Sequence, residues 1–101
     1  MENIVVIVAK IKAKPGKTQE LRRELQELER GTHLEPGVLV YEVNQSSTKP
    51  EDFLVYEKYG SQEVFDAHLA GPALQHFVTL APQLVEGEIE IYPYKPVPAT
   101  D

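Results

Sequence analysis

The chain contains no cysteine. It can therefore form no disulfide, no thiolate nucleophile and no cysteine-ligated zinc or iron–sulfur site, and we expect a cytoplasmic protein. Basic clusters are missing as well, and the formal net charge is −6. An acidic chain without a basic patch argues against nucleic acid and anionic membrane surfaces as partners.

Long apolar runs and the common ligand motifs are also missing. No segment has the ~18 consecutive apolar residues of a membrane-spanning helix. The apolar N-terminal segment lacks a basic start and is interrupted by Lys10, which indicates a strand and not a signal peptide. There is no glycine-rich nucleotide motif, no serine-hydrolase motif and no histidine pair at i, i+4 spacing. We therefore expect no nucleotide and no metal.

The residues that are present form alternating strand and helix patterns. Four segments have apolar residues that are β-branched or alternate with polar ones, as strands do. They are residues 4–11, 38–44, 53–59 and 88–94. Three segments have apolar residues at helical spacing. They are residues 18–30, a segment between Ser61 and Gly71, and one that begins at Pro72 and is limited by Pro82.

This order predicts one α+β domain over residues 1–101, with a core at 4–94 and a loose proline-rich tail at 95–101. The arrangement β-α-β-β-α-β, with its second helix split in two, is typical of a ferredoxin-like antiparallel sheet with helices on one face. Because residues 4–11 are apolar on both sides, the open face of the sheet must also be covered. We predict a homodimer through the sheet face.

His68 is the first candidate for chemistry. It shares a helix face with Val64, Phe65 and Leu69, so it should point inward over the sheet. One interpretation is a buried histidine satisfied by a hydrogen bond. The other is a general base, with Glu57 or Asn44 holding its tautomer. His76 should lie on the solvated side of its helix.

Glu57 and the strand aromatics are the other candidates. Glu57 lies among apolar neighbours on its strand, so it must be paired or exposed. Glu57 could form an ion pair with Lys10, with Lys12 or with a residue of the second subunit, or it could orient His68. Tyr41, Tyr56, Tyr59 and Phe53 could line a flat aromatic pocket or belong to the core. Asn44 should lie beside Phe53 across the hairpin, as a binding group or a simple turn residue.

Several short motifs resemble those of the antibiotic biosynthesis monooxygenase family. They are Pro15-Gly16-Lys17, Pro36-Gly37 followed by Leu39-x-Tyr41, Phe53-x-x-Tyr56-Glu57-x-Tyr59, Ser61 with His68, and Gly71-Pro72-Ala73-Leu74. The resemblance extends from about residue 4 to residue 92 and implies small dimeric α/β barrels. Haem-degrading members are similar in using a tryptophan where this chain has His68 and a haem-ligating histidine near Val78. Haem degradation is therefore not expected.

The resemblance implies a cofactor-independent monooxygenase that oxidises a quinol or polyphenolic small molecule with O2. In that interpretation His68 removes a proton and Glu57 orients it. Tyr59, Asn44, Phe53 and Phe65 would bind the substrate. Two alternatives remain open at this point: an isomerase or tautomerase of a small oxo compound in the same pocket, and a dimer that binds a small molecule without catalysis.

Overall fold

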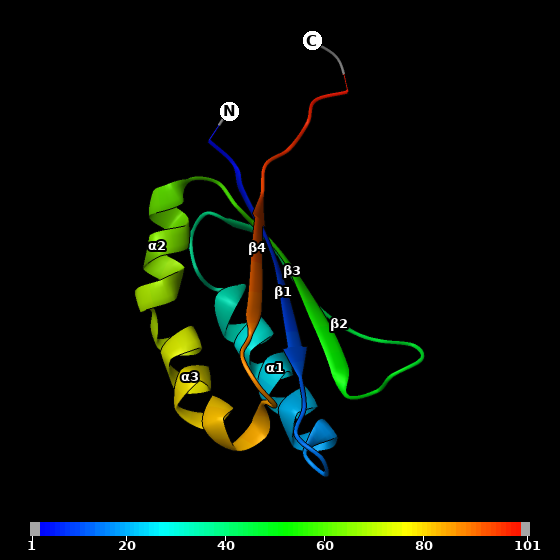
Figure 1. Ribbon diagram of the computed structural model, residues 1–101. Coiled ribbons are helices and arrows are strands. Elements are labelled where there is room, and N and C mark those ends of the chain that lie inside the picture. Colours follow the sequence, from blue (N-terminus) through cyan, green and yellow to red (C-terminus); the bar gives the residue numbers. More distant parts are fainter. Residues whose placement is uncertain (1–2, 100–101) are drawn as a thin grey trace.

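Four antiparallel strands form one sheet in the computed structural model, which describes residues 3–99 (Figure 1). The order of elements along the chain is the predicted one, and the ferredoxin-like α+β fold is confirmed. The elements are β1 (Val5–Lys12), α1 (Thr18–Thr32), β2 (Val38–Gln45), β3 (Asp52–Tyr59), α2 (Gln62–Ala70), α3 (Pro72–Leu84) and β4 (Glu90–Tyr94).

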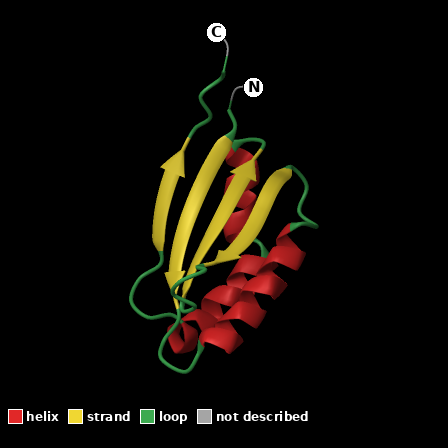
Figure 2. Ribbon diagram, turned by 90° about the vertical axis from the view of Figure 1, so that its right-hand side faces the viewer, coloured by secondary structure: helices red, strands yellow, loops and turns green. Residues whose placement is uncertain are grey.

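The strands lie in the order β2-β3-β1-β4, so β1 and β3 are central. All three helices cover the same face of the sheet (Figure 2). β3 shows the resulting alternation most clearly, because Phe53, Val55, Glu57 and Tyr59 are buried while the residues between them are half-buried. Side chains of a strand alternate between the two faces, so these four residues point toward the helices.

The face turned away from the helices is called the outer face below. The strand registers place on it the side chains that alternate with the buried set. They are Val6, Val8, Lys10 and Lys12 of β1, Val40, Glu42 and Asn44 of β2, Asp52, Leu54, Tyr56 and Lys58 of β3, and Glu90, Tyr92 and Tyr94 of β4. No helix of residues 3–99 lies on this face (Figure 2).

Helix α1 anchors the layer of helices. Its apolar stripe, Leu21, Leu25 and Leu28, is at most 4% exposed and packs in the core with Phe53 and Phe77. Burying each leucine contributes about 1.5–3 kcal/mol relative to leaving it in water. The predicted amphipathic helix is confirmed, and its stripe fixes the distance between helices and sheet.

The structure differs from the sequence-based expectation in three respects. Helix α3 continues past Pro82 to Leu84, so this proline lies inside the last turns of the helix and does not end it. Leu69, expected to share the inward face of its helix with His68, is 43% exposed, and Val78 of α3 is 48% exposed. Strand β4 begins at Glu90, and every one of its residues is exposed because it is an edge strand with no helix above it.

Candidate active site

His68 is the only buried residue of helix α2, with 2% of its surface exposed. The helix begins where the Ser61 hydroxyl accepts a hydrogen bond from the Val64 backbone N–H at 3.2 Å, and it ends at Gly71. This short segment therefore has fixed ends, and its buried face is set by them. The expected inward orientation of His68 is confirmed.

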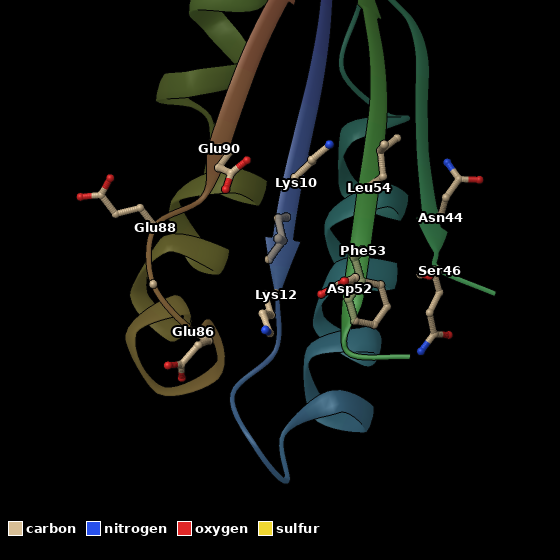
Figure 3. Close-up of a pocket in the computed structure, with 13 residues that line it drawn as sticks. Lys10, Lys12, Asn44, Ser46, Asp52, Phe53, Leu54, Glu86, Glu88 and Glu90 are labelled. Carbon is tan, nitrogen blue, oxygen red and sulfur yellow. The ribbon is translucent and has the colours of Figure 1, made fainter. Parts of the chain in front are cut away.

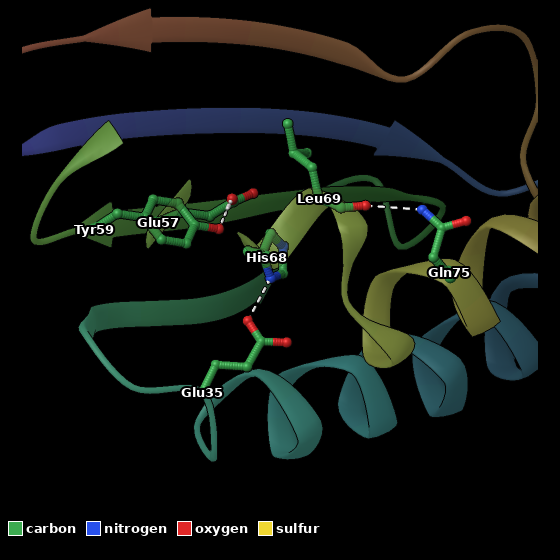
Figure 4. Close-up of polar contacts among 6 residues, drawn as sticks. All are labelled: Glu35, Glu57, Tyr59, His68, Leu69 and Gln75. Atoms are coloured by element: carbon green, nitrogen blue, oxygen red, sulfur yellow. Dashed lines mark hydrogen bonds and ion pairs between the residues drawn. The ribbon is translucent and has the colours of Figure 1, made fainter. Parts of the chain in front are cut away.

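Glu35 is the hydrogen-bond partner of His68. Nδ1 of His68 lies 2.9 Å from Oε1 of Glu35 (Figure 4). The expected partners, Glu57 and Asn44, are wrong, because Glu57 is bonded to Tyr59 and Asn44 lies on the outer face. A carboxylate only accepts, so with Glu35 ionised Nδ1 carries the proton. Nε2 of His68 makes no hydrogen bond within the described residues 3–99.

A tight turn brings Glu35 to the helix. The backbone N–H of Glu35 donates to the carbonyl of Thr32 at 2.9 Å, directly after α1 ends. Pro36 and Gly37 then reverse the chain, and Gly37 has a positive φ of 85°. A Cβ on Gly37 would lie 2.5 Å from Cγ2 of Val64 in α2. The glycine therefore allows the turn and α2 to approach closely enough for the Glu35–His68 contact.

Glu57 and Tyr59 form a second polar pair. The Tyr59 hydroxyl donates to Oε1 of Glu57 at 2.5 Å, and both residues are buried. Burial raises the pKa of Glu57 to about 7, and the hydrogen bond from Tyr59 opposes this rise. Neither Lys10 nor Lys12 pairs with Glu57, because the strand register places both lysines on the outer face.

Two phenol rings flank the imidazole. The ring centroid of His68 lies 5.3 Å from that of Tyr41 and 5.4 Å from that of Tyr59. Burial, followed by the nearby Glu57 carboxylate, raises the pKa of both phenols well above the ordinary value. Both therefore stay neutral at physiological pH. Phe65 contacts Tyr59 at a centroid distance of 5.0 Å and extends this cluster of aromatic rings.

The structure does not bring every candidate to His68. His68, Glu57, Tyr59, Tyr41 and Phe65 lie in one region, as the contacts above show. Phe53 shares the helix-facing side of β3 with Tyr59, but five residues of extended strand lie between them, so they are about 20 Å apart. Asn44 and Tyr56 point to the outer face. Alternation along the strands is the physical reason for this division.

Asn44 and Phe53 instead line a hollow of about 720 Å³ (Figure 3). Its other walls carry Lys10 and Lys12 of β1 and the segment from Glu86 to Glu90. Charges of both signs meet there, and His68 does not line it. Sequence reasoning also missed Glu35. Its signal was a glutamate directly before a Pro-Gly turn, which by itself does not indicate where the carboxylate points.

Within residues 3–99, no three histidine, aspartate or glutamate side chains come close enough together to ligate a metal ion. None of the helices described for the chain combines the length and apolar character needed to cross a bilayer.

Comparison with known proteins places these features in a family. The model of the family described as antibiotic biosynthesis monooxygenase matches residues 4–80. Protein sll1783 of Synechocystis sp. is 30% identical over 91 residues, which are 90% of this chain and 62% of that protein. The chain thus spans less than two thirds of the length of that relative.

Two solved structures show the same fold. Protein SO0527 from Shewanella oneidensis superposes with a TM-score of 0.83 at 35% identity, covering 93% of each chain. Protein PA3566 from Pseudomonas aeruginosa superposes with a TM-score of 0.91 at 22% identity, covering 97% of this chain and 98% of its own. The family match over most of the sequence shows that the chain belongs to the antibiotic biosynthesis monooxygenase family.

Proposed function

We propose that the protein is a cofactor-independent monooxygenase that oxidises a quinol or polyphenolic small molecule with O2, and that His68 is its general base. The observation that carries the proposal is the hydrogen bonding of the two ring nitrogens of His68. Nδ1 faces the Glu35 carboxylate, and Nε2 has no hydrogen-bond partner in the described chain. A buried imidazole with one free basic nitrogen can remove a phenolic proton. Membership of the family supports the same reaction class.

The reaction needs no added reductant. Nε2 of His68 takes the proton of a substrate hydroxyl, and the electron-rich anion reduces O2 directly. One oxygen atom enters the ring and the other leaves as water, so that quinol and O2 give hydroxyquinone and water. All the electrons come from the substrate. The protein supplies the base, a site shielded from water, and flat surfaces from Tyr59 and Phe65 that orient the ring.

Glu57 acts differently in this proposal from its expected role. Its Oε1 accepts the hydrogen bond of the Tyr59 hydroxyl, whereas His68 is bonded to Glu35. In this proposal Glu57 therefore fixes the Tyr59 phenol, whose ring centroid lies 5.4 Å from that of His68. A group with a pKa of about 7 can also give or take a proton near neutral pH. This feature favours a second candidate function, the isomerisation or tautomerisation of a small oxo compound by His68 and Glu57 without O2.

Oxygen consumption with reduced naphthoquinones tests the proposal. We expect His68→Ala to lower the rate by about 100-fold or more, because general base catalysis contributes about 10²–10⁴. The control is His76→Ala, since the His76 side chain is 67% exposed and lies on α3. Turnover by His68→Ala at the wild-type rate would show that the base is assigned wrongly.

Two further outcomes separate the alternatives. Conversion of a small oxo compound under strictly anaerobic conditions would favour the isomerase. A ligand that raises the melting temperature but is never converted would favour a binding protein, because a ligand specific for the folded state stabilises it.

The proposal includes a homodimer formed through the outer face. This face carries Val8, Leu54, Tyr56 and Tyr92, and no helix of residues 3–99 covers it (Figure 2). The apolar side chains of such a face are buried when a second copy of the chain packs its own outer face against them. Lys10 and Lys12 lie in the same hollow as Glu86 and Glu88, so a two-fold arrangement can pair opposite charges across the interface.

A further inference from the structure

We propose that Glu35 is the positioning residue of this site, which holds His68 with its proton on Nδ1 and thereby makes Nε2 the basic nitrogen. The mechanistic meaning of this inference rests on the proposed function, but the tautomer itself is a property of the protein alone. A histidine without such a partner is free to carry its proton on either nitrogen.

The first support is that the contact is short and shielded. Oε1 of Glu35 lies 2.9 Å from Nδ1, the His68 side chain is 2% exposed and the Glu35 side chain is 21% exposed. In Figure 4 the Glu35 carboxylate and the Glu57–Tyr59 pair lie on opposite sides of the His68 ring. A hydrogen bond to an ionised acceptor in such surroundings is strong, and water competes for it poorly.

The second support is that Glu35 has no competing cation. Its Oε2 atom is buried and has no hydrogen-bond partner among the described residues. No lysine or arginine forms an ion pair with Glu35 in the part of the chain that the structure covers. His68 is therefore the side chain to which the Glu35 carboxylate is hydrogen-bonded. When Nε2 takes up a substrate proton, the Glu35 carboxylate stabilises the imidazolium that forms, as the aspartate does in a Ser-His-Asp triad.

The third support is that the backbone leaves room for this carboxylate. A Cβ on Gly71 would lie 3.3 Å from Oε2 of Glu35, which is tighter than an ordinary contact. Gly71 is also the N-cap of α3 and brings no side chain to that helix end. The positive end of the α3 dipole favours a carboxylate nearby.

The experiment is ¹⁵N nuclear magnetic resonance of the imidazole in the full-length protein, which reports which ring nitrogen carries the proton. We expect the proton on Nδ1 in the wild type. In Glu35→Ala the proton should move to Nε2 or distribute over both nitrogens. The matched control is Glu29→Ala, which removes another half-buried glutamate that bonds only the backbone N–H of Val43, at 3.0 Å. Its His68 tautomer should match the wild type.

Activity provides the second measurement. Glu35→Ala should lower kcat by about 10- to 100-fold with little change in KM, because a misoriented base loses rate and not binding. Should Glu35→Ala fail to fold, Glu35→Gln keeps the shape of the side chain. Its amide can donate to Nδ1 or accept from it, so it should no longer fix one tautomer.

The two proposals fail in different ways. A wild-type His68 protonated on Nε2 overturns the positioning role without any variant, as does an unchanged Nδ1–H tautomer in Glu35→Ala. A wild-type Nδ1–H tautomer lost in Glu35→Ala, in a protein that consumes no O2 with any quinol, leaves the positioning role intact and refutes the monooxygenase.

Discussion

Two glutamates form hydrogen bonds with the two central side chains of the site, His68 and Tyr59, and the surroundings of the two glutamates differ. Glu35 faces a histidine that can become a cation, whereas Glu57 faces only the neutral hydroxyl of Tyr59. Burial raises the pKa of Glu57 to about 7, so the environment of Glu57 penalises its ionised form. Carboxyl groups so placed can divide the roles of charged partner and neutral hydrogen-bonding group.

The raised pKa of Glu57 predicts how stability depends on pH. Its folded-state pKa of about 7 exceeds the ordinary 4.5, so the folded protein binds this proton more tightly than the unfolded chain. The contribution is therefore fully present below pH 4.5 and is lost as the pH rises to about 7. The loss is about 3 kcal/mol.

Glu57→Gln should remove this dependence while keeping an acceptor for the Tyr59 hydroxyl. We expect the variant to match the wild type at pH 4.5 and to exceed its free energy of unfolding by up to about 3 kcal/mol at pH 8. Urea unfolding across this range measures the difference. Glu63→Gln, at an exposed position, is the control. A wild-type advantage that grows from pH 4.5 to pH 8 would contradict the assignment.

At the scale of elements, the site depends on two segments that pack closely: the turn at 35–37 and helix α2. The sequence predicts both, because Pro36-Gly37 is typical of a turn and Ser61 with Gly71 delimits a short helix. It does not predict that they touch. Glu35 and His68 are 33 residues apart, and their contact depends on how α2 packs against the turn, which no local pattern encodes.

Gly37→Ala tests this packing. The residue has a φ of 85°, and a Cβ there would lie 2.5 Å from Val64 in α2. We expect destabilisation of about 1–3 kcal/mol from the backbone strain alone, and a loss of activity from the displaced α2. Gly16→Ala is a matched control, because Gly16 has a φ of 78° and nothing lies within 4 Å of the added Cβ. Equal effects of the two variants on activity would show that the turn and α2 are not coupled.

For the whole molecule, the sequence predicts the order of elements and the ferredoxin-like sheet but not which strand face meets the helices. Residues 4–11 are apolar on both sides, so alternation alone does not identify the inner face. The placement of Asn44 illustrates the consequence. It was expected near His68, yet it shares the outer face with Glu42 and Leu54. The face on which Asn44 lies follows only from the register of β2 against β3.

The outer face leads to a prediction about how two copies of the chain assemble. Val8 lies on the central strand β1, paired with Tyr56 on one side and Tyr92 on the other. Val8→Glu places a charge in the middle of the proposed interface, where it would be buried without a partner. We expect the wild type to sediment as a dimer at micromolar concentration and the variant as a folded monomer. The core should tolerate the change, because this side chain points away from the helices.

Val78→Glu is the control for that experiment, since Val78 is 48% exposed on α3, on the helical side of the sheet. It should leave the dimer intact. A stable dimer of this kind needs about 800 Å² from each partner, which a four-stranded sheet face can supply. A wild-type protein that is monomeric at tens of micromolar, or a Val8→Glu variant that remains dimeric, would contradict assembly through the outer face. In either case the exposed Tyr92 and Tyr94 would need another explanation.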